Sequence, residues 1–173
     1  MRYANDMIAA IRQEIRLRKQ DAKVPVETIY FGGGTPSVLS PTQLRLLLDE
    51  VNSSFSVVAD PEITLEANPD DLSPEYINDL QKLGFNRLSI GVQSFLDDEL
   101  TLMNRAHNGI QALSSVEHAK KRFDNVSIDL LFGNPNTTLG DWKRNLDYAL
   151  QLEVPHISSY ALTLEPKTAL ERF

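Results

Sequence analysis

The chain has no cysteine among its 173 residues. It therefore forms no disulfide, has no cysteine nucleophile and offers no thiolate to a metal. Basic residues are also scarce, since 17 Lys and Arg face 24 Asp and Glu, for a net charge of −7. This balance argues against a nucleic acid or an anionic membrane as the main partner. There is no apolar run of membrane-spanning length and no signal-peptide pattern, so we expect a cytoplasmic protein.

The composition that remains is typical of one globular domain, with 42% hydrophobic and 24% charged residues. Strand-like runs alternate with helical patterns at about 30 residues per unit, which is typical of a βα repeat with a parallel sheet. We expect strands at Glu27–Gly32, Glu62–Ala67, Arg87–Gln93, Ser127–Phe132 and His156–Thr163. We expect helices at Tyr3–Lys19, Pro41–Phe55, Ser73–Gly84, Asp97–Asn104, Ile110–Arg122 and Asp141–Leu152.

Local signals support several of these helix limits. Ser40-Pro41 and Ser73-Pro74 each offer a serine N-cap followed by proline at the first helical position. Gly84 is the residue type that ends a helix in the left-handed conformation. The opening helix is expected to pack through a stripe of isoleucines, at Ile8, Ile11 and Ile15.

Alternation along the strands indicates which parallel architecture forms. One face is apolar, at Ile63, Leu65, Leu88, Ile90, Val92, Ile128 and Leu130. The other is small or polar, at Thr64, Glu66, Ser89, Gly91, Gln93, Ser127, Asp129, Ser159, Ala161 and Thr163. Strands covered by helices on both faces would be apolar throughout, so the polar face indicates either a barrel interior or a solvated surface. Because a closed eight-stranded barrel needs about 200–250 residues, we expect an α/β fold that is part of a barrel.

The segment Thr28–Ser37 carries three consecutive glycines, Gly32, Gly33 and Gly34, directly after a strand and before Thr35. It lacks the Gly-Lys-Ser/Thr of a P-loop and the spacing of a dinucleotide fingerprint. Glycines at this position either expose backbone groups to an amino or carboxylate group of a ligand, or form a tight turn that needs positive φ.

Polar side chains end three of the expected strands, at Glu66, Gln93 and Asp129. Parallel barrels place their sites at this end, so these residues and the glycines indicate a pocket for a polar small molecule. Arg105 follows a short helix and is either a partner for a ligand carboxylate or a surface charge. His107 is expected to be a capping or surface histidine, with a proton donor as the alternative.

Five segments of the chain form a family pattern: Tyr30–Ser37, Ile63–Pro69, Asn86–Phe95, Asn104–His107 and Ile128–Gly133. Together they resemble the radical S-adenosylmethionine (SAM) proteins of the oxygen-independent coproporphyrinogen III oxidase family. The resemblance covers essentially the whole chain in order. A further segment, Leu162–Thr168, is more similar to the heme-chaperone branch of this family than to the true oxidases.

The resemblance implies a partial (βα)6 TIM-like barrel and a role for each site residue. Gly32, Gly33, Gly34 and Thr35 would hold the amino and carboxylate groups of SAM, as the family's glycine motif does. Glu66 would add to the contacts with the amino group, and Arg105 would pair with the carboxylate. Ribose hydroxyls would be bound by Gln93 and Asp129, and adenine would lie near Leu131 and Thr163.

The chain departs from the family in two ways. Gly133-Asn-Pro-Asn136 stands where the family has Gly-Leu-Pro-Gly. The family's three-cysteine motif is absent, so the chain cannot ligate a [4Fe–4S] cluster. We therefore expect residues 1–173 to be a core part of a longer protein, without the first strand with its cluster loop and without the C-terminal domain. This part should have no radical chemistry of its own, no catalytic residue and no metal ligand, and should bind SAM weakly.

The whole protein would cleave SAM reductively and oxidise coproporphyrinogen III, or would bind SAM and heme and transfer the heme. Its partners would be small molecules rather than nucleic acid, and the oligomeric state stays open. One alternative is a non-catalytic heme-trafficking protein. The other is an unrelated barrel enzyme in which the glycine loop binds phosphate.

Overall fold

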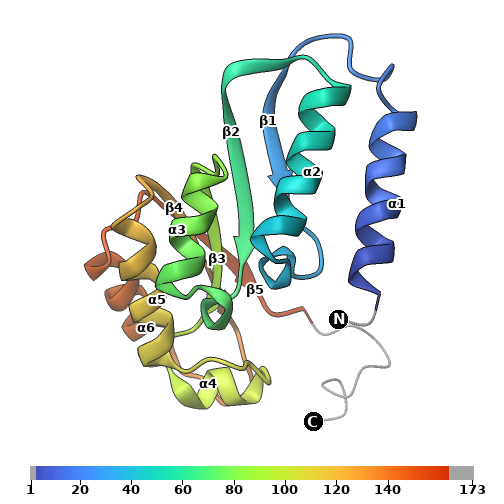
Figure 1. Ribbon diagram of the computed structural model, residues 1–173. Coiled ribbons are helices and arrows are strands. Elements are labelled where there is room, and N and C mark those ends of the chain that lie inside the picture. The colour runs from blue at the N-terminus through green and yellow to red at the C-terminus, as the bar shows by residue number, and fades with distance from the viewer. Residues whose placement is uncertain (1–2, 164–173) are drawn as a thin grey trace.

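The computed structural model describes residues 3–163 as one sheet of five parallel strands with helices between them (Figure 1). The strands are β1 (Val26–Phe31), β2 (Val57–Ala67), β3 (Arg87–Gln93), β4 (Asn125–Phe132) and β5 (His156–Ala161). The α-helices are α1 (Ala4–Leu17), α2 (Pro41–Ser54), α3 (Pro74–Lys82), α4 (Asp97–Leu102), α5 (Gly109–Lys120) and α6 (Leu139–Gln151). Two 3₁₀ turns, η1 (Pro36–Val38) and η2 (Pro69–Asp71), follow β1 and β2.

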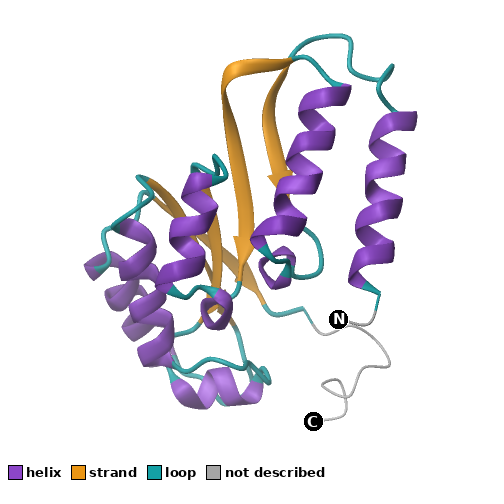
Figure 2. Ribbon diagram, in the orientation of Figure 1, coloured by secondary structure: helices purple, strands orange, loops and turns teal. Residues whose placement is uncertain are grey.

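The strands lie in the order β1-β2-β3-β4-β5, and every neighbouring pair is parallel. The helices lie on one side of this curved sheet (Figure 2). This arrangement confirms the expected α/β fold, a curled half-barrel of the TIM-like type. Because all strands run the same way, the loops that follow them meet at one edge of the sheet.

Alternation separates the two faces of the sheet as expected. The apolar positions form the core beneath the helices, and none is more than 9% exposed: Ile63, Leu65, Leu88, Ile90, Val92, Ile128 and Leu130. On the opposite face, Ser89 and Ser127 are buried in register with each other, and the Ser127 hydroxyl donates to Ser89 Oγ at 3.0 Å. The two buried serines of this face therefore satisfy each other across the strands.

The last strand corrects one sequence expectation. Ser158 is in register with Asp129, and His156 with Ser127, so the polar face of β5 carries His156 and Ser158. Ser159 and Ala161, expected on that face, instead pair with Leu130 and Phe132 on the opposite face. The predicted alternation is shifted by one residue, because β5 is short and its pairing register is set by β4 and not by its own pattern.

Several expected element limits are confirmed by hydrogen bonds. The side chains of Ser40 and Ser73 accept from Gln43 N–H and Tyr76 N–H respectively, as N-caps do. Gly84 follows α3 with a φ of 94°, so the predicted left-handed ending is present.

Three elements start two or more residues earlier than expected. β4 starts at Asn125, which pairs with Arg87. β2 starts at Val57, because Val57 pairs with Val26 across a register shift. α6 starts at Leu139, because Thr138 caps it and Asp141 completes a capping box.

Helix α1 packs on α2. Ile8 is 3% exposed, whereas Ile11 remains 37% exposed, so the predicted isoleucine stripe is only partly covered. Arg12 and Arg16 both pair with Glu50 of α2, a carboxylate that is itself 6% exposed. These ion pairs hold the pKa of Glu50 below its usual range.

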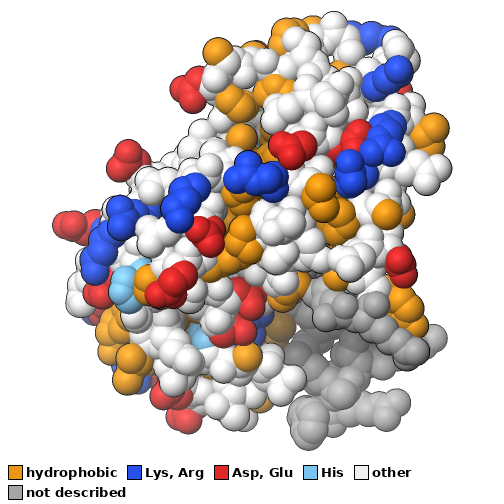
Figure 3. Space-filling view, viewed as in Figure 1, with side chains coloured by type: hydrophobic (Ala, Val, Ile, Leu, Met, Phe, Trp, Pro, Cys, Tyr) orange, Lys and Arg blue, Asp and Glu red, His pale blue; other side chains and the backbone are white. Residues whose placement is uncertain are grey.

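Charge on the helical face is mixed in sign. In the space-filling view, basic side chains form a loose band with acidic side chains on both sides of it (Figure 3). None of the helices in the described part of the chain combines the length and apolar character needed to cross a bilayer.

Candidate functional site

A cavity of about 200 Å³ lies at the edge of the sheet where the strands end. Its walls come from the loops after β1 and β2, from the ends of β3 and β4, and from the segment after α4. Among the residues that line it are Gly34, Thr35, Glu66, Gln93, Arg105 and Asp129, all of which the sequence had marked as candidate site residues. The remaining lining residues are Pro36, Ala67, Asn68, Ser89 and Gly91.

The glycine loop forms the tight turn with positive φ that was one of the two alternatives considered for it. Gly33 and Gly34 have φ values of 77° and 68°, a conformation that other residues adopt rarely. At Gly32 the constraint is space, because an added Cβ would lie 2.5 Å from the Tyr30 ring and 2.9 Å from Glu66 Oε1. The loop therefore needs glycine for its turn and for close approach.

Glu66 is held from two sides. Its Oε2 accepts from the Gly33 N–H at 3.0 Å, and its Oε1 accepts from the Tyr30 hydroxyl at 2.7 Å. Burial, and then the hydrogen bond with Glu66, raise the pKa of Tyr30 to about 12. Tyr30 was not among the expected site residues, although its register with Thr64 places it on the polar face. The tyrosine and the glycine loop together hold the carboxylate at the rim of the cavity.

Asp129 ends the polar face of β4. Burial raises the pKa of this carboxyl above its ordinary value, and the nearby charge of Glu66 acts in the same direction. Hydrogen bonds with Ser158 and Ser89 act against this shift. The buried Oδ1 atom has no hydrogen-bond partner. An unpaired buried acceptor beside a cavity is suited to receive a donor from a ligand.

Gln93 reaches the cavity through a local irregularity in β3. The pairing with β4 shifts register between Ile90 and Gln93, and Gln93 has a φ of 66°. A positive φ at a residue other than glycine is uncommon and is often found at functional sites. Gly91 leaves room for this side chain, because a Cβ there would lie 3.0 Å from Gln93 Nε2.

Arg105 is directed into the cavity by the end of α4. Asn104, with a φ of 53°, turns the chain, and the Arg105 N–H donates back to the Leu100 carbonyl. The guanidinium then donates to Asn68 Oδ1 at 2.7 Å and to the Gly91 carbonyl at 2.9 Å. Arg105 is therefore a half-buried cavity residue, and the alternative of an ordinary surface charge is wrong.

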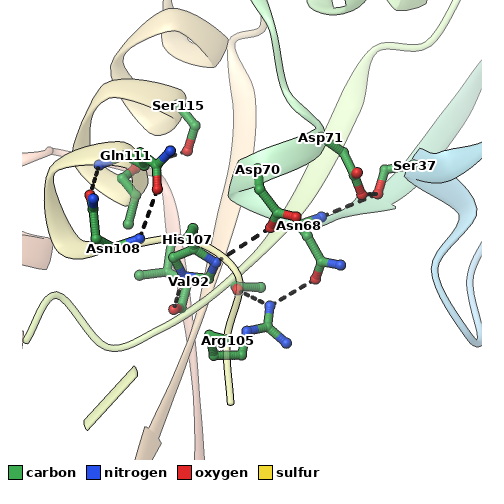
Figure 4. A network of polar contacts seen from close by, with 12 residues as sticks. Ser37, Asn68, Asp70, Asp71, Val92, Arg105, His107, Asn108, Gln111 and Ser115 are labelled. Carbon is green, nitrogen blue, oxygen red and sulfur yellow. Dashed lines mark hydrogen bonds and ion pairs between the residues drawn. The ribbon is translucent and has the colours of Figure 1, made fainter. Parts of the chain in front are cut away.

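His107 lies behind Arg105 and is 3% exposed, so the expected surface or capping role is wrong. Its Nε2 lies 3.0 Å from the Val92 carbonyl oxygen, and its Nδ1 lies 3.6 Å from Asp70 Oδ1 (Figure 4). Burial lowers the pKa of this imidazole. Asn68, the acceptor for Arg105, also belongs to this network and had not been singled out by sequence.

The structure does not bring every expected residue into the cavity. Gly32 and Gly33 line a neighbouring apolar groove of about 430 Å³, which also contacts α1 and α2. Leu131 is half-buried and in register with Tyr160, outside the cavity wall. Thr163 lies beyond the end of β5 and is exposed. Most of the Leu162–Thr168 segment lies outside the described residues.

Comparison with known proteins identifies the class. The sequence profile of the radical SAM superfamily matches residues 4–149, and the chain belongs to this superfamily. The chain is 41% identical over 167 residues to the heme chaperone HemW of Bacillus subtilis, which is 95% of this chain and 44% of that protein. It is 40% identical over 144 residues to HemW of Escherichia coli, covering 83% of this chain and 38% of that protein.

Solved structures support the same superfamily. Coproporphyrinogen III oxidase (HemN) from Escherichia coli, a radical SAM enzyme, matches with a TM-score of 0.89 and 30% identity. The match covers 98% of this chain and 40% of that chain. An archaeal Elp3 from Methanocaldococcus infernus, at a TM-score of 0.71 and 21% identity, shares the fold over 94% of this chain and 43% of its own. The chain thus spans about two-fifths of the length of its curated relatives and of these structures.

Members of the superfamily use SAM and a [4Fe–4S] cluster. The residues present fit the first of these groups, because the cavity offers an unpaired Asp129 oxygen, exposed loop amides and a guanidinium. They do not fit the second, because cluster iron is held by thiolates and this sequence contains no cysteine.

Proposed function

We propose that this chain is the SAM-binding core barrel of a HemW-like radical SAM protein that acts in heme or porphyrin metabolism. The observation that carries the proposal is the set of charges in the cavity. Glu66 and Asp129 face it as carboxylates and Arg105 as a guanidinium. SAM carries an ammonium, a sulfonium and a carboxylate, so its charges are complementary to those of the cavity.

The methionine end of SAM would lie against the glycine loop. Its ammonium group would donate to Glu66, whose carboxylate is already oriented by Tyr30 and Gly33. Its carboxylate would accept a charge-assisted pair of hydrogen bonds from Arg105. The backbone groups of Gly34 and Thr35 would be available to contact the same methionine end of SAM. This arrangement agrees with the roles that the family resemblance implies.

The adenosine end would extend along β3 and β4. Gln93 can donate to and accept from the ribose hydroxyls, and the unpaired Oδ1 of Asp129 can accept from them. A cavity of about 200 Å³ is below the range of roughly 300–1,000 Å³ typical of small-molecule pockets. It therefore encloses only part of SAM, with adenine toward Leu131 and Thr163 at its open side.

Affinity is expected to be low. A cluster iron would supply further contacts to SAM, and this chain has no cysteine to hold such a cluster. We expect a Kd of about 1 mM, which corresponds to a binding free energy of about −4 kcal/mol. We derive no radical step for this chain, because such a step needs the cluster.

A phosphate-binding glycine loop is the competing function. The cavity opposes it, because Glu66 and Asp129 would repel a phosphate and Arg105 is its single cationic lining residue within the described part of the chain. Inorganic phosphate is therefore the appropriate control ligand.

Titration with SAM, followed by NMR of backbone amides and calorimetry, tests the proposal. We expect shifts at Gly33, Gly34 and Arg105, at least tenfold weaker binding in Glu66→Gln, and unchanged binding in a surface control, Asp79→Asn. Shifts produced by phosphate but not by SAM would refute the proposal. A micromolar Kd for SAM would refute the separate idea that the cluster anchors the ligand.

Two activities are open to the whole protein, and sequence identity favours one. The chain is 41% identical to a heme chaperone and 30% identical to coproporphyrinogen III oxidase. We therefore propose that the whole protein binds and transfers heme. Titration of the full-length protein with heme, beside an assay for coproporphyrinogen decarboxylation, distinguishes the two: decarboxylation without heme binding would favour the oxidase.

A further inference from the structure

We propose that His107 is a positioning residue of the SAM site, which couples protonation of its own imidazole to the orientation of Arg105. SAM binding would then depend on pH through a residue that does not touch the ligand. The inference rests on the proposed function, because it takes Arg105 as the partner of the SAM carboxylate.

The geometry around the imidazole leaves one nitrogen unpaired. A carbonyl oxygen only accepts hydrogen bonds, so Nε2 must carry the hydrogen that points to Val92 O at 3.0 Å. In the neutral ring, Nδ1 is then an acceptor that faces the carboxylate of Asp70 at 3.6 Å. Two acceptors facing each other form no hydrogen bond, and Nδ1 is indeed buried without a partner. Protonation turns Nδ1 into a donor and creates a charge-assisted bond to Asp70.

The same two segments hold Arg105. Asp70 lies in η2, two residues after Asn68, and Asn68 Oδ1 accepts from the Arg105 guanidinium at 2.7 Å. His107 lies two residues after Arg105 on the other segment, so its contact with Asp70 and the contact of Arg105 with Asn68 run in parallel (Figure 4).

The Asn68 N–H also donates to the Ser37 hydroxyl at 3.2 Å, and Ser37 contacts Asp71 (Figure 4). A tighter contact between His107 and Asp70 therefore acts on the loops after β1, β2 and β3 together.

Two charged groups act on the imidazole. Asp70 from η2 favours its protonated form, and Arg105 from its own segment disfavours it. Burial is the largest influence and lowers the pKa below the ordinary value of about 6.5. The α-amino group of a ligand such as SAM stays protonated in this range, because its own pKa is about 8. A change in SAM affinity within this pH range therefore arises from a group of the protein and not from the ligand.

NMR of the ligand-free chain tests the coupling without SAM. We expect the Arg105 side-chain N–H signals to shift with the same midpoint as the His107 ring signals. In Asp70→Asn the amide can donate to the neutral Nδ1, so the pH dependence of the Arg105 signals should disappear. The matched control is Asp79→Asn on α3, whose side chain is 44% exposed and pairs with Lys82, and this variant should retain the pH dependence. Arg105 signals that ignore the His107 titration, or a ring that stays neutral until acid unfolding, would overturn the proposal.

SAM titrations across the same pH range complete the test. We expect affinity to rise about fivefold as His107 is protonated, the low end of typical coupling because Asp70 is exposed. His107→Gln keeps a donor for Val92 O but does not titrate, so the rise in affinity that accompanies protonation of His107 should be absent. Asp129 in the cavity, whose pKa is raised, titrates in both proteins alike. An unchanged pH profile in His107→Gln would overturn the inference. Coupled NMR signals without SAM binding would support the coupling and reject the proposed function instead.

Discussion

Replacing Asp129 with asparagine should stabilise the ligand-free chain near pH 7. The native carboxyl is buried beside Glu66, its Oδ1 has no partner, and its pKa is raised above the ordinary value. An amide of the same shape removes the buried charge and keeps an acceptor for Ser158. Leaving a buried charged group unpaired costs more than the ~1–3 kcal/mol typical of a neutral polar group, and asparagine removes that excess. Because Asp129 is only half-buried, we expect a gain of about 1 kcal/mol, or ~3 °C in Tm for a chain of this length.

The sign of the pH dependence follows from the direction of the shift. A carboxyl whose pKa is raised in the folded state binds more protons there than in the unfolded chain. Its contribution to stability is therefore present below the unfolded pKa of about 3.9 and is lost as pH rises through the folded pKa. The difference in stability between Asp129→Asn and the parent chain should therefore grow as pH rises across that interval, and it should be absent near pH 3.5.

Urea unfolding measures this directly. The single tryptophan, Trp142, packs against Phe132 at the end of β4, with ring centroids 5.2 Å apart, so its fluorescence reports on the strand that carries Asp129. Asp124→Asn, at an exposed turn before β4, controls for the loss of one negative charge. The reasoning fails if Asp129→Asn is no more stable than the parent near pH 7, or if its gain persists unchanged near pH 3.5.

Two further substitutions test the loops around the cavity. Gly32→Ala should destabilise the chain by about 2 kcal/mol, because the new methyl group overlaps Tyr30 and Glu66. Gly33→Ala has open space and should lose only about 1 kcal/mol for its positive φ, so equal urea midpoints for the two would contradict this account. Asn134 is 5% exposed with both amide atoms unpaired, and Asn134→Leu should raise stability by about 1 kcal/mol in thermal unfolding. A Tm for Asn134→Leu below that of the parent chain would contradict this prediction.

The parts of the fold that sequence predicted well are those with local causes. The caps at Ser40 and Ser73 and the ending at Gly84 depend on hydrogen bonds within a few residues, and all are present. Strand β3 was predicted residue for residue, because alternation is strict from Arg87 to Val92. The start of β2 was not predicted, because it depends on pairing with Val26 across a register shift.

The candidate site likewise contains residues that the sequence predicts and residues that it does not. Gly34, Thr35, Glu66, Gln93 and Asp129 were found from their positions at strand ends, where a parallel sheet gathers its loops. What sequence missed are partners that lie far apart along the chain. Tyr30 and Glu66 are separated by 36 residues, and Asn68 and Arg105 by 37, so no local pattern indicates either pair.

By itself, then, the sequence determined the alternation of strands and helices, the polar face of β2 to β4, the need for glycine after β1 and the lack of any thiolate for a cluster. These follow from the chemistry of each residue and its immediate neighbours. Only the tertiary structure decided that β5 presents Ser158 rather than Ser159 beside Asp129, and that His107 is buried behind Arg105. Register and burial are set by contacts with other elements, and those contacts exist only once the loops have been brought to one edge of the sheet.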